Sequence, residues 1–224
     1  MSVRWVLTKK VVDGKTITKA RLVARGLQEN SDTLRTDSPT CMRETLKLML
    51  AMSCSYGYQL NAIDIKAAFL QGKPISRTLY VKPPKEAQVP GKLWLLKKAV
   101  YGLSDASRVW YLRVVDELMA MGVEVSQYDK AMFIWRPQGT PEGFLCVHVD
   151  DFLWCGSKQF QEKIIGGLKR VFKISKENQL AFRYLGVDLT QSHGQLSVDQ
   201  SAYVETISPI ELKKTPTTET SSEL

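Results

Sequence analysis

Two apolar runs separated by a pair of carboxylates constrain the fold of this chain more than any other segment. Residues 144–149 form the first run, residues 152–155 form the second, and Asp150-Asp151 lies between them. Runs this short, ending at Gly156, predict buried strands rather than a helix, and two intervening residues predict a tight hairpin. We therefore expect both carboxylates at a hairpin tip, where each raises the pKa of the other unless a cation neutralises them.

A third carboxylate, Asp64, indicates that the Asp150-Asp151 pair could bind metal ions. Asp-Asp is also ordinary turn chemistry, so the pair alone is compatible with a purely structural role. Leu60 and Ala62 alternate with polar residues, which predicts a strand with Asp64 near its C-terminal end. One strand aspartate and two hairpin aspartates can hold two cations about 4 Å apart, as in phosphoryl-transfer sites. Hard carboxylate oxygens suit Mg²⁺ or Mn²⁺.

The composition is that of an ordinary globular protein. Hydrophobic residues make up 44% of the 224 residues and charged residues 24%, and no apolar run approaches the roughly 20 residues of a membrane-spanning helix. The N-terminus carries no secretory signal pattern, so we expect an intracellular, cytoplasmic protein without a membrane partner. The four cysteines lack zinc-ligand spacing. Cys146 and Cys155 flank the aspartates symmetrically, so we expect them opposite each other as free thiols.

Basic residues are in excess and clustered. The net charge is +8, and residues 1–30 hold seven Lys or Arg against two acidic residues. Residues 82–113 and 158–176 show similar clusters. Such clusters suit a polyanion such as nucleic acid, although solvated lysine-rich faces would produce the same counts.

Three basic residues alternate along one predicted strand. Because Lys19, Arg21 and Arg25 are two or four positions apart, we expect their side chains on one face. A convergent basic face suits a triphosphate or template phosphates. The alternative is a solvated outer face of a hairpin.

The rest of the chain alternates between strand and helix patterns. Strands are predicted on both sides of an Asp13-Gly14 turn, and the longest helix is predicted to end at Gly122. Helices interspersed with antiparallel hairpins indicate an α+β fold with helices on one sheet face. The predicted strands are residues 3–8, 16–25, 79–81, 93–100, 131–135, 143–149, 182–190 and 195–198, and the predicted helices are 43–56, 104–121, 157–172 and 199–207.

Seven segments, in order along the chain, also match the motifs of one protein family. They are Lys19–Gly26, Asp37–Pro39, Ala62–Gly72, Leu79–Pro84, Val100–Tyr111, Val147–Phe152 and Tyr184–Val187. Together they resemble KARLVARG, FSP, LDVxNAFLNG, VYMxQPPG, LYGLKQAPRxWY, YVDDI and FLGI of the reverse transcriptases of Ty1/copia-type LTR retrotransposons. Each motif alone is weak evidence, and their shared order makes the resemblance specific.

The resemblance implies a right-hand polymerase fold, with an antiparallel palm sheet packed on helices and with a truncated thumb. It also implies a fragment of a longer Pol polyprotein. The implied boundaries are about 1–57 and 73–103 for the fingers, about 58–72 and 104–190 for the palm, 191–207 for the start of the thumb, 1–207 for the whole core, and 208–224 for a disordered tail.

The implied activity is RNA-directed DNA polymerisation, in which dNTPs extend a primer on an RNA or DNA template with two Mg²⁺ (or Mn²⁺) ions. Asp64, Asp150 and Asp151 would be catalytic and metal-binding, helped by the Ile65 carbonyl. Further partners would be other parts of the retrotransposon polyprotein, in a virus-like particle. The residues implied for dNTP binding are Phe69, Tyr101, Gly102, Lys19 and Arg21, and those for nucleic-acid binding are Arg25, His148, Arg108, Leu185 and Gly186.

Phe69 has two interpretations. It lies five residues after Asp64, at the family's steric-gate position, where a bulky ring would exclude a ribose 2′-hydroxyl. An ordinary core phenylalanine explains it equally well.

Two departures from the family pattern bear on activity. Ser104–Ser107 reads Ser-Asp-Ala-Ser where the family has Lys-Gln-Ala-Pro. The change removes a cation and adds Asp105 near the expected nucleotide pocket. His148 replaces the family's usual Tyr. The alternatives are a catalytically inert remnant that still binds nucleic acid, or a module that keeps the fold to bind a partner.

Overall fold

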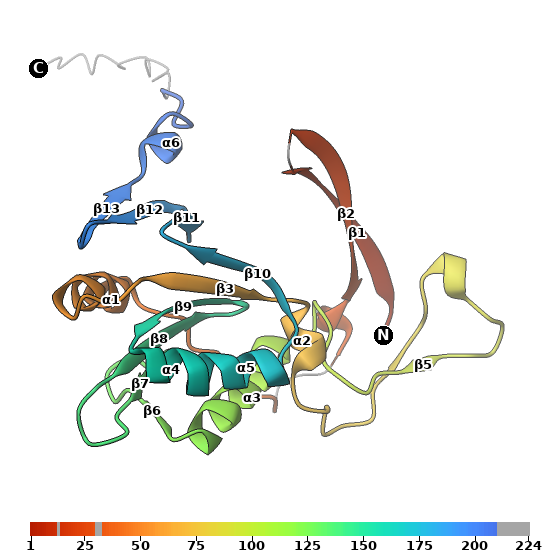
Figure 1. Ribbon diagram of the computed structural model, residues 1–224. Helices are drawn as coiled ribbons and strands as arrows, with labels where there is room; N and C mark the ends of the chain where they lie inside the picture. Colours follow the sequence, from red (N-terminus) through yellow and green to blue (C-terminus); the bar gives the residue numbers. More distant parts are fainter. Residues whose placement is uncertain (13, 30–32, 210–224) are drawn as a thin grey trace, which may run out of the picture.

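A six-stranded antiparallel sheet forms the centre of the molecule (Figure 1). The computed structural model describes residues 1–209 except residue 13 and residues 30–32. The strand order is β10-β3-β9-β8-β7-β6, so β3 lies between two strands from much later in the chain. The strands are β3 (Asn61–Ile65), β6 (Val123–Val125), β7 (Met132–Trp135), β8 (Gly143–His148), β9 (Asp151–Gly156) and β10 (Ile174–Gln179).

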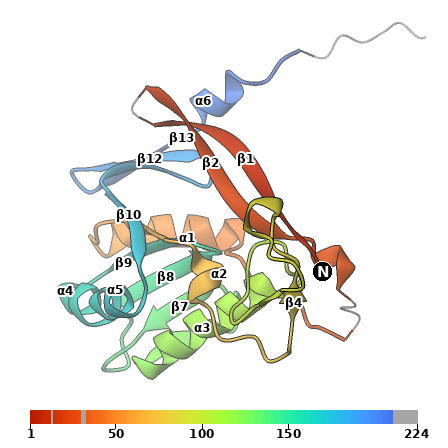
Figure 2. The same ribbon diagram turned by 90° about the vertical axis from the view of Figure 1, so that its right-hand side faces the viewer.

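Smaller antiparallel sheets and helices surround this sheet. The smaller sheets are β1 (Val3–Val12) with β2 (Lys15–Ala24), β4 (Tyr80–Val81) with β5 (Trp94–Leu95), and β11 (Ala181–Tyr184), β12 (Val187–Ser192) and β13 (Gln195–Asp199). The α-helices are α1 (Arg43–Ser55), α2 (Ala68–Gln71), α3 (Ala106–Ala120), α4 (Lys158–Phe160), α5 (Gly166–Val171) and α6 (Ser201–Val204), and short 3₁₀ or π segments are η1 (Gly26–Gln28), η2 (Lys85–Ala87) and η3 (Gln161–Ile165). The β1–β2 ribbon stands away from the body (Figure 2).

Helices cover both faces of the central sheet, which makes the fold α+β. α3 and the continuous segment α4–η3–α5 pack on one face, and α1 packs on the other. The prediction of helices on one face only is therefore wrong. Side chains alternate along β8, so Leu145 and Val147 enter the first core and Phe144 and Cys146 enter the second. An unbroken apolar run is typical of a strand buried on both faces.

The β8–β9 hairpin turns one residue earlier than predicted. His148 pairs with Asp151, so the two turn residues are Val149 and Asp150, and Asp151 begins β9. Val149 has a φ of 57°, which is strained for a β-branched residue, and the Trp110 indole donates a 2.6 Å hydrogen bond to its carbonyl. The tip is therefore held from α3 below.

The earlier turn also shifts the cysteines. Cys146 pairs with Leu153, and Cys155 pairs with Phe144, so the expected opposition of Cys146 and Cys155 is wrong. Both thiols are free and buried, and burial raises the pKa of Cys155 to about 12.

Other predictions failed where tertiary pairing decides the conformation. Of the predicted strand 93–100, Trp94–Leu95 pairs with β4 and Lys98 forms an isolated bridge with Pro74, so no continuous strand forms. The predicted strand 182–190 is broken by a turn at Leu185-Gly186. Sequence pattern missed β6 and β10. β10 carries polar side chains and is mostly exposed, so it has no apolar alternation, and its pairing with β3 makes it a strand.

Several local signals were correct. α1 and α3 form where predicted, and Gly122 follows α3 with a φ of 78°. Ser157 caps α4, its hydroxyl accepting a 3.2 Å hydrogen bond from Phe160 N–H. Asp13 of the predicted turn and residues 210–224 of the predicted tail lie outside the described residues. Within the described part of the chain, no helix combines the length and apolarity needed to cross a membrane.

Candidate active site

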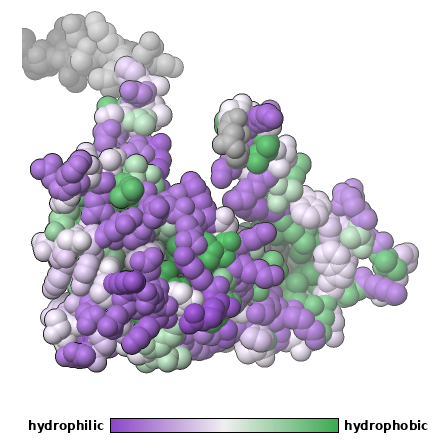
Figure 3. Space-filling model, in the orientation of Figure 1, coloured by the Kyte–Doolittle hydropathy of each residue, from purple (hydrophilic) through white to green (hydrophobic). Residues whose placement is uncertain are grey.

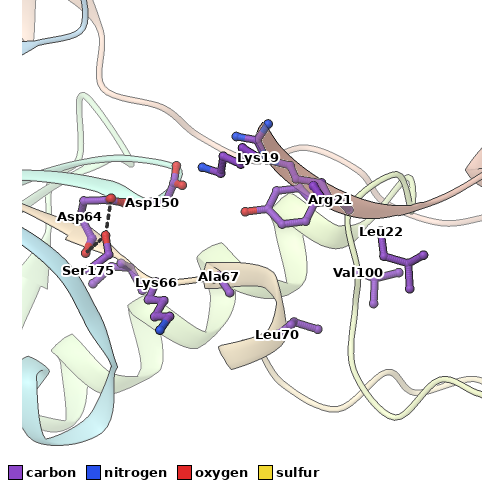
Figure 4. A pocket seen from close by; sticks show the side chains of 13 residues that line it. Lys19, Arg21, Leu22, Asp64, Lys66, Ala67, Leu70, Val100, Asp150 and Ser175 are labelled. Atoms are coloured by element: carbon purple, nitrogen blue, oxygen red, sulfur yellow. Dashed lines mark hydrogen bonds between the residues drawn. The ribbon is translucent and has the colours of Figure 1, made fainter. Parts of the chain in front are cut away.

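The ends of several elements meet around a cavity of about 510 Å³. The β1–β2 ribbon forms one wall, and the end of β3 with the β8–β9 tip forms the opposite wall (Figure 4). The space-filling view shows apolar residues in the hollow beneath the ribbon and hydrophilic residues around it (Figure 3). The residues around the cavity include Lys19, Arg21, Asp64, Tyr101, Asp150 and Ser175.

Two of the three predicted carboxylates lie opposite each other on neighbouring strands, and the third lies in the adjoining turn. Asp64 pairs directly with Asp151 across β3 and β9, so both side chains lie on the same face of the sheet. Asp150 lies in the turn, and its carbonyl accepts a 2.8 Å hydrogen bond from the Ile65 N–H. Asp64, Ile65 and Asp150 line the cavity, whereas Asp151 does not.

Burial and mutual repulsion perturb two of these carboxyl groups. Burial raises the pKa of Asp150, the Asp64 carboxylate raises it further, and Lys19 and Arg21 oppose this. Burial also raises the pKa of Asp151, with Asp150 and Asp64 adding to the effect. Partly buried carboxylates that repel each other are stabilised by a cation.

The donor set fits a divalent cation in its chemistry, although the ligands are not gathered into a finished site. In the described part of the chain, no three His, Cys, Asp or Glu side chains are grouped as a metal centre. The carboxylates that line the cavity are those of Asp64 and Asp150, and hard carboxylate oxygens are the ligands that Mg²⁺ prefers. One Asp64 oxygen also accepts a hydrogen bond from Ser175.

Two of the three predicted basic residues face these carboxylates. Lys19 and Arg21 line the cavity from β2, and Lys19 extends toward Asp150 (Figure 4). Arg25 lies beyond the end of β2 at Ala24 and borders a separate recess. The prediction that all three share one face is therefore wrong, because the strand alternation stops before Arg25.

Tyr101 and Gly102 attach the ribbon to the cavity. The Ala24 N–H donates a 2.7 Å hydrogen bond to the Tyr101 carbonyl. Gly102 has a φ of 90°, and a Cβ there would lie 2.1 Å from the Ala24 carbonyl oxygen. Only glycine permits this approach of the two backbones. The Tyr101 side chain lines the cavity, and burial raises its pKa.

Phe69 lies behind this wall rather than in it. Its side chain is 9% exposed and belongs to the main core. Its ring centroid is 4.7 Å from that of Tyr101, so a change at Phe69 would reach the cavity through Tyr101.

The Leu185-Gly186 turn follows Tyr184, whose side chain contacts the backbone of Asp151. Leu185 is exposed, and both residues have positive φ. At the end of β11, the Tyr184 hydroxyl lies 3.5 Å from the Asp151 carbonyl oxygen. The Gln191 side-chain amide accepts a 2.7 Å hydrogen bond from Leu60 N–H and donates a 3.0 Å hydrogen bond to the Tyr58 carbonyl. These two bonds connect β12 to the start of β3.

Arg108 and His148 lie outside the cavity lining. Arg108 forms an ion pair with Asp37 at 2.5 Å, and the guanidinium groups of Arg35 and Arg108 lower the pKa of Asp37. His148 pairs with Asp151, and its buried Nδ1 has no hydrogen-bond partner among the described residues.

Asp105 does not line the cavity. Its carboxylate is buried and receives two hydrogen bonds from Arg77, at 2.6 and 3.0 Å. Arg77 also binds Glu29. The expectation that Asp105 lies near this pocket is therefore wrong, because its carboxylate is turned toward the ion pair of Arg77 and Glu29.

Sequence reasoning missed Ser175, Lys66 and Leu70, which also line the cavity. Lys66 and Leu70 lie within the motif around Asp64, so their proximity to that residue was a usable signal. Ser175 lies in a strand without apolar alternation, and no sequence signal could have found it.

Comparisons with known proteins assign the family. Residues 1–222 match the family described as reverse transcriptase (RNA-dependent DNA polymerase). The chain is 27% identical over 208 residues to a retrovirus-related Pol polyprotein from an Arabidopsis thaliana transposon, covering 90% of this chain and 14% of that protein. It is 28% identical over 187 residues to a truncated Ty1 Gag-Pol polyprotein of Saccharomyces cerevisiae, covering 79% of this chain and 15% of that protein.

The chain therefore spans about a seventh of the length of these relatives. Among solved structures, an apo telomerase from Candida tropicalis is similar over 72% of this chain and 41% of that chain, at 12% identity and a TM-score of 0.44, too low for an argument. Because the family match covers nearly the whole chain, the chain belongs to the reverse transcriptase family, in the group carried by Ty1/copia-type Pol polyproteins.

Proposed function

We propose that this chain is the core of an RNA-directed DNA polymerase that adds dNTPs to a primer 3′ end. One observation carries the proposal: Asp64 and Asp150 face Lys19 and Arg21 across a single cavity. Carboxylates suit metal ions, and cations suit the phosphates of a nucleotide. A nucleotidyl transfer needs both in one place.

The position of each residue in the cavity would determine its role in the reaction. Asp64 and Asp150 would hold two divalent cations, with Asp151 and the Ile65 backbone beside them. When bound, such cations lower the pKa of the primer 3′-hydroxyl and neutralise the triphosphate. Lys19 and Arg21 bind and orient the triphosphate from the opposite wall.

The incoming nucleotide and the nucleic acid would contact residues around the same cavity. Tyr101, Gly102 and Phe69 support the nucleoside of the incoming dNTP, Phe69 acting through the Tyr101 ring. The Leu185-Gly186 turn would contact the primer, which the contact of the neighbouring Tyr184 hydroxyl with the Asp151 carbonyl oxygen supports. Arg25, Arg108 and His148 contribute to binding the strands outside the cavity.

The chain would comprise the fingers, the palm and the beginning of the thumb of a polymerase. Residues 1–57 and 73–103 would form the fingers, and residues 58–72 with 104–190 would form the palm. Residues 191–207 would begin the thumb. Other parts of a Pol polyprotein would be the natural partners, because the relatives are much longer than this chain.

Primer extension tests the proposal directly. We expect extension of a DNA primer on an RNA template that requires Mg²⁺ or Mn²⁺ and stops on chelation. Filter binding of the same primer–template should weaken steeply with salt, because phosphate contacts release counterions. Extension that proceeds equally well in chelator would contradict the proposal.

One observation favours a second candidate, a remnant that binds nucleic acid without catalysis. The described residues contain no group of three His, Cys, Asp or Glu side chains placed to hold a metal ion. Salt-dependent binding without any metal-dependent extension would select this candidate.

The basic wall should determine nucleotide affinity. Replacing Lys19 and Arg21 together by Ala removes both cations opposite Asp150. The KM for dNTP should therefore rise by about a hundredfold or more, since charge-assisted hydrogen bonds each contribute roughly 1.5–3 kcal/mol. Steady-state extension kinetics measure this rise. Lys9→Ala with Lys15→Ala, on the same ribbon outside the cavity, provides the matched control and should leave the KM unchanged.

Phe69→Val tests the two interpretations of that residue. If the ring acts as a gate through Tyr101, the variant should incorporate rNTPs more readily and retain its dNTP incorporation. Single-nucleotide incorporation assays give the dNTP/rNTP ratio. An unchanged ratio together with a lowered melting temperature would assign Phe69 to the core alone.

A further inference from the structure

The start of β10 carries an irregularity beside the carboxylates. β10 pairs with β3, and the register shifts between Ile174 and Lys176. This shift marks a β-bulge at Ser175, and bulges near active sites re-aim side chains. Ser175 lines the same cavity as Asp64 and Asp150.

The Ser175 hydroxyl makes direct contact with Asp64. It donates a hydrogen bond to the Asp64 Oδ2 and lies 3.2 Å from the Asp64 carbonyl oxygen (Figure 4). Oδ1 makes no hydrogen bond within the described residues. One carboxylate oxygen is therefore held and the other is left for a further ligand.

A second contact fixes the backbone from which Ser175 projects. The Gln71 amide donates to the Lys66 carbonyl at 2.6 Å and accepts from the Lys173 N–H at 2.8 Å. Lys66 N–H also donates to the Lys173 carbonyl at 2.9 Å. The residues after Asp64 and before Ser175 are thus locked together, which keeps the hydroxyl aimed at the carboxylate.

We propose that Ser175 is a positioning residue that holds the Asp64 carboxylate in the orientation that presents its free oxygen to a divalent cation. The terminal torsion of an aspartate is soft, so an unrestrained Asp64 would sample orientations that cannot share a cation with Asp150. Hydrogen bonds to ligating carboxylates commonly tune metal affinity in this way. The proposal rests on the proposed function, because it assumes that Asp64 binds metal.

A purely structural role makes a different prediction. If Ser175 only joined β10 to β3, the backbone bonds of Gln71 and Lys66 would preserve the pairing without its hydroxyl. Metal affinity would then be the same with or without that group. The two roles are separated by metal binding, not by fold stability.

The test compares two side chains of nearly the same shape. Ser175→Thr keeps a hydroxyl, whereas Ser175→Val replaces it with a methyl group, and both are suited to a strand. Mn²⁺ binding to the full chain is measured by the electron paramagnetic resonance signal of free Mn²⁺, without substrate. Ser175→Val should raise the Kd for Mn²⁺ by about tenfold or more, and Ser175→Thr should remain close to the original protein.

Controls make each outcome decisive. Ser192→Ala removes an exposed hydroxyl that hydrogen-bonds His193, away from the cavity, and should not change the Kd. Circular dichroism verifies folding, and Ser175→Ala replaces the Val variant if that variant unfolds. Equal affinities for the hydroxyl-bearing and hydroxyl-free variants would overturn the Ser175 proposal. If Asp64→Asn also leaves Mn²⁺ binding unchanged, the proposed metal function fails instead.

Discussion

Asp150→Asn is expected to reduce primer extension by roughly 10³-fold or more, since loss of a metal-binding carboxylate removes several kcal/mol of transition-state stabilisation. The substitution preserves the shape of the side chain and removes one negative charge facing Lys19 and Arg21. Binding of primer–template should therefore stay the same or strengthen slightly. Single-turnover extension beside filter binding measures both effects.

The same substitution should also stabilise the fold at neutral pH. Burial and the Asp64 carboxylate raise the pKa of Asp150 in the folded chain, so its ionised form costs stability at every pH above that raised pKa. The gain from Asn should be present at neutral pH and disappear as the pH falls below the ordinary pKa of aspartate. Thermal unfolding without metal at several pH values measures this gain.

The matched control is Asp116→Asn on α3, where the carboxylate pairs with Lys73 at the surface. It should change neither extension nor binding. If Asp150→Asn retained extension comparable to the Asp116 control, the placement of the chemistry at the β8–β9 tip would be wrong.

Arg77→Met should produce the largest loss of stability, about 3–5 kcal/mol in the free energy of unfolding. Arg77 lies between Glu29 and Asp105, whose side chains are only 7% and 8% exposed. Both carboxylates raise the pKa of Arg77. Removing the cation leaves two buried anions with no charge partner. The cost of desolvating both carboxylates on folding is then no longer offset by their attraction to Arg77. Urea denaturation gives the free energy of unfolding.

Two further variants locate the cause of this loss. Arg136→Met breaks a surface ion pair with Glu124 and should change stability by about 1 kcal/mol or less. Adding Glu29→Gln and Asp105→Asn to Arg77→Met should recover a large part of the loss, because the unpaired charges disappear. A triple variant no more stable than Arg77→Met would show that packing of the arginine, rather than charge, is what matters.

The ion cluster also explains the family departure at Ser104–Ser107. Glu29 follows η1, Arg77 lies in the segment before β4, and Asp105 directly precedes α3 without a side-chain capping bond. The ion pairs of Arg77 with Glu29 and Asp105 connect the segment after the ribbon, the segment before β4 and the start of α3. Asp105 therefore serves the attachment of the β1–β2 ribbon, a role that local sequence could not reveal because its partner is 28 positions away.

Local sequence determined the elements whose signals are short-range. The apolar runs around Asp150, the alternation before Asp64, the Ser157 cap and the Gly122 stop each depend on neighbouring residues, and each predicted element formed. The order of seven motifs similarly identified the family. These features follow from side-chain period and capping, which act over one or two turns.

Tertiary structure alone decided the register and the completed site. The turn fell on Val149-Asp150 because β8 and β9 pair in that register and the Trp110 indole holds the tip. β10 became a strand only by pairing with β3, which brought Ser175 to Asp64 across 111 positions of sequence. Such contacts depend on the energy of long-range pairing and burial, which no local pattern encodes.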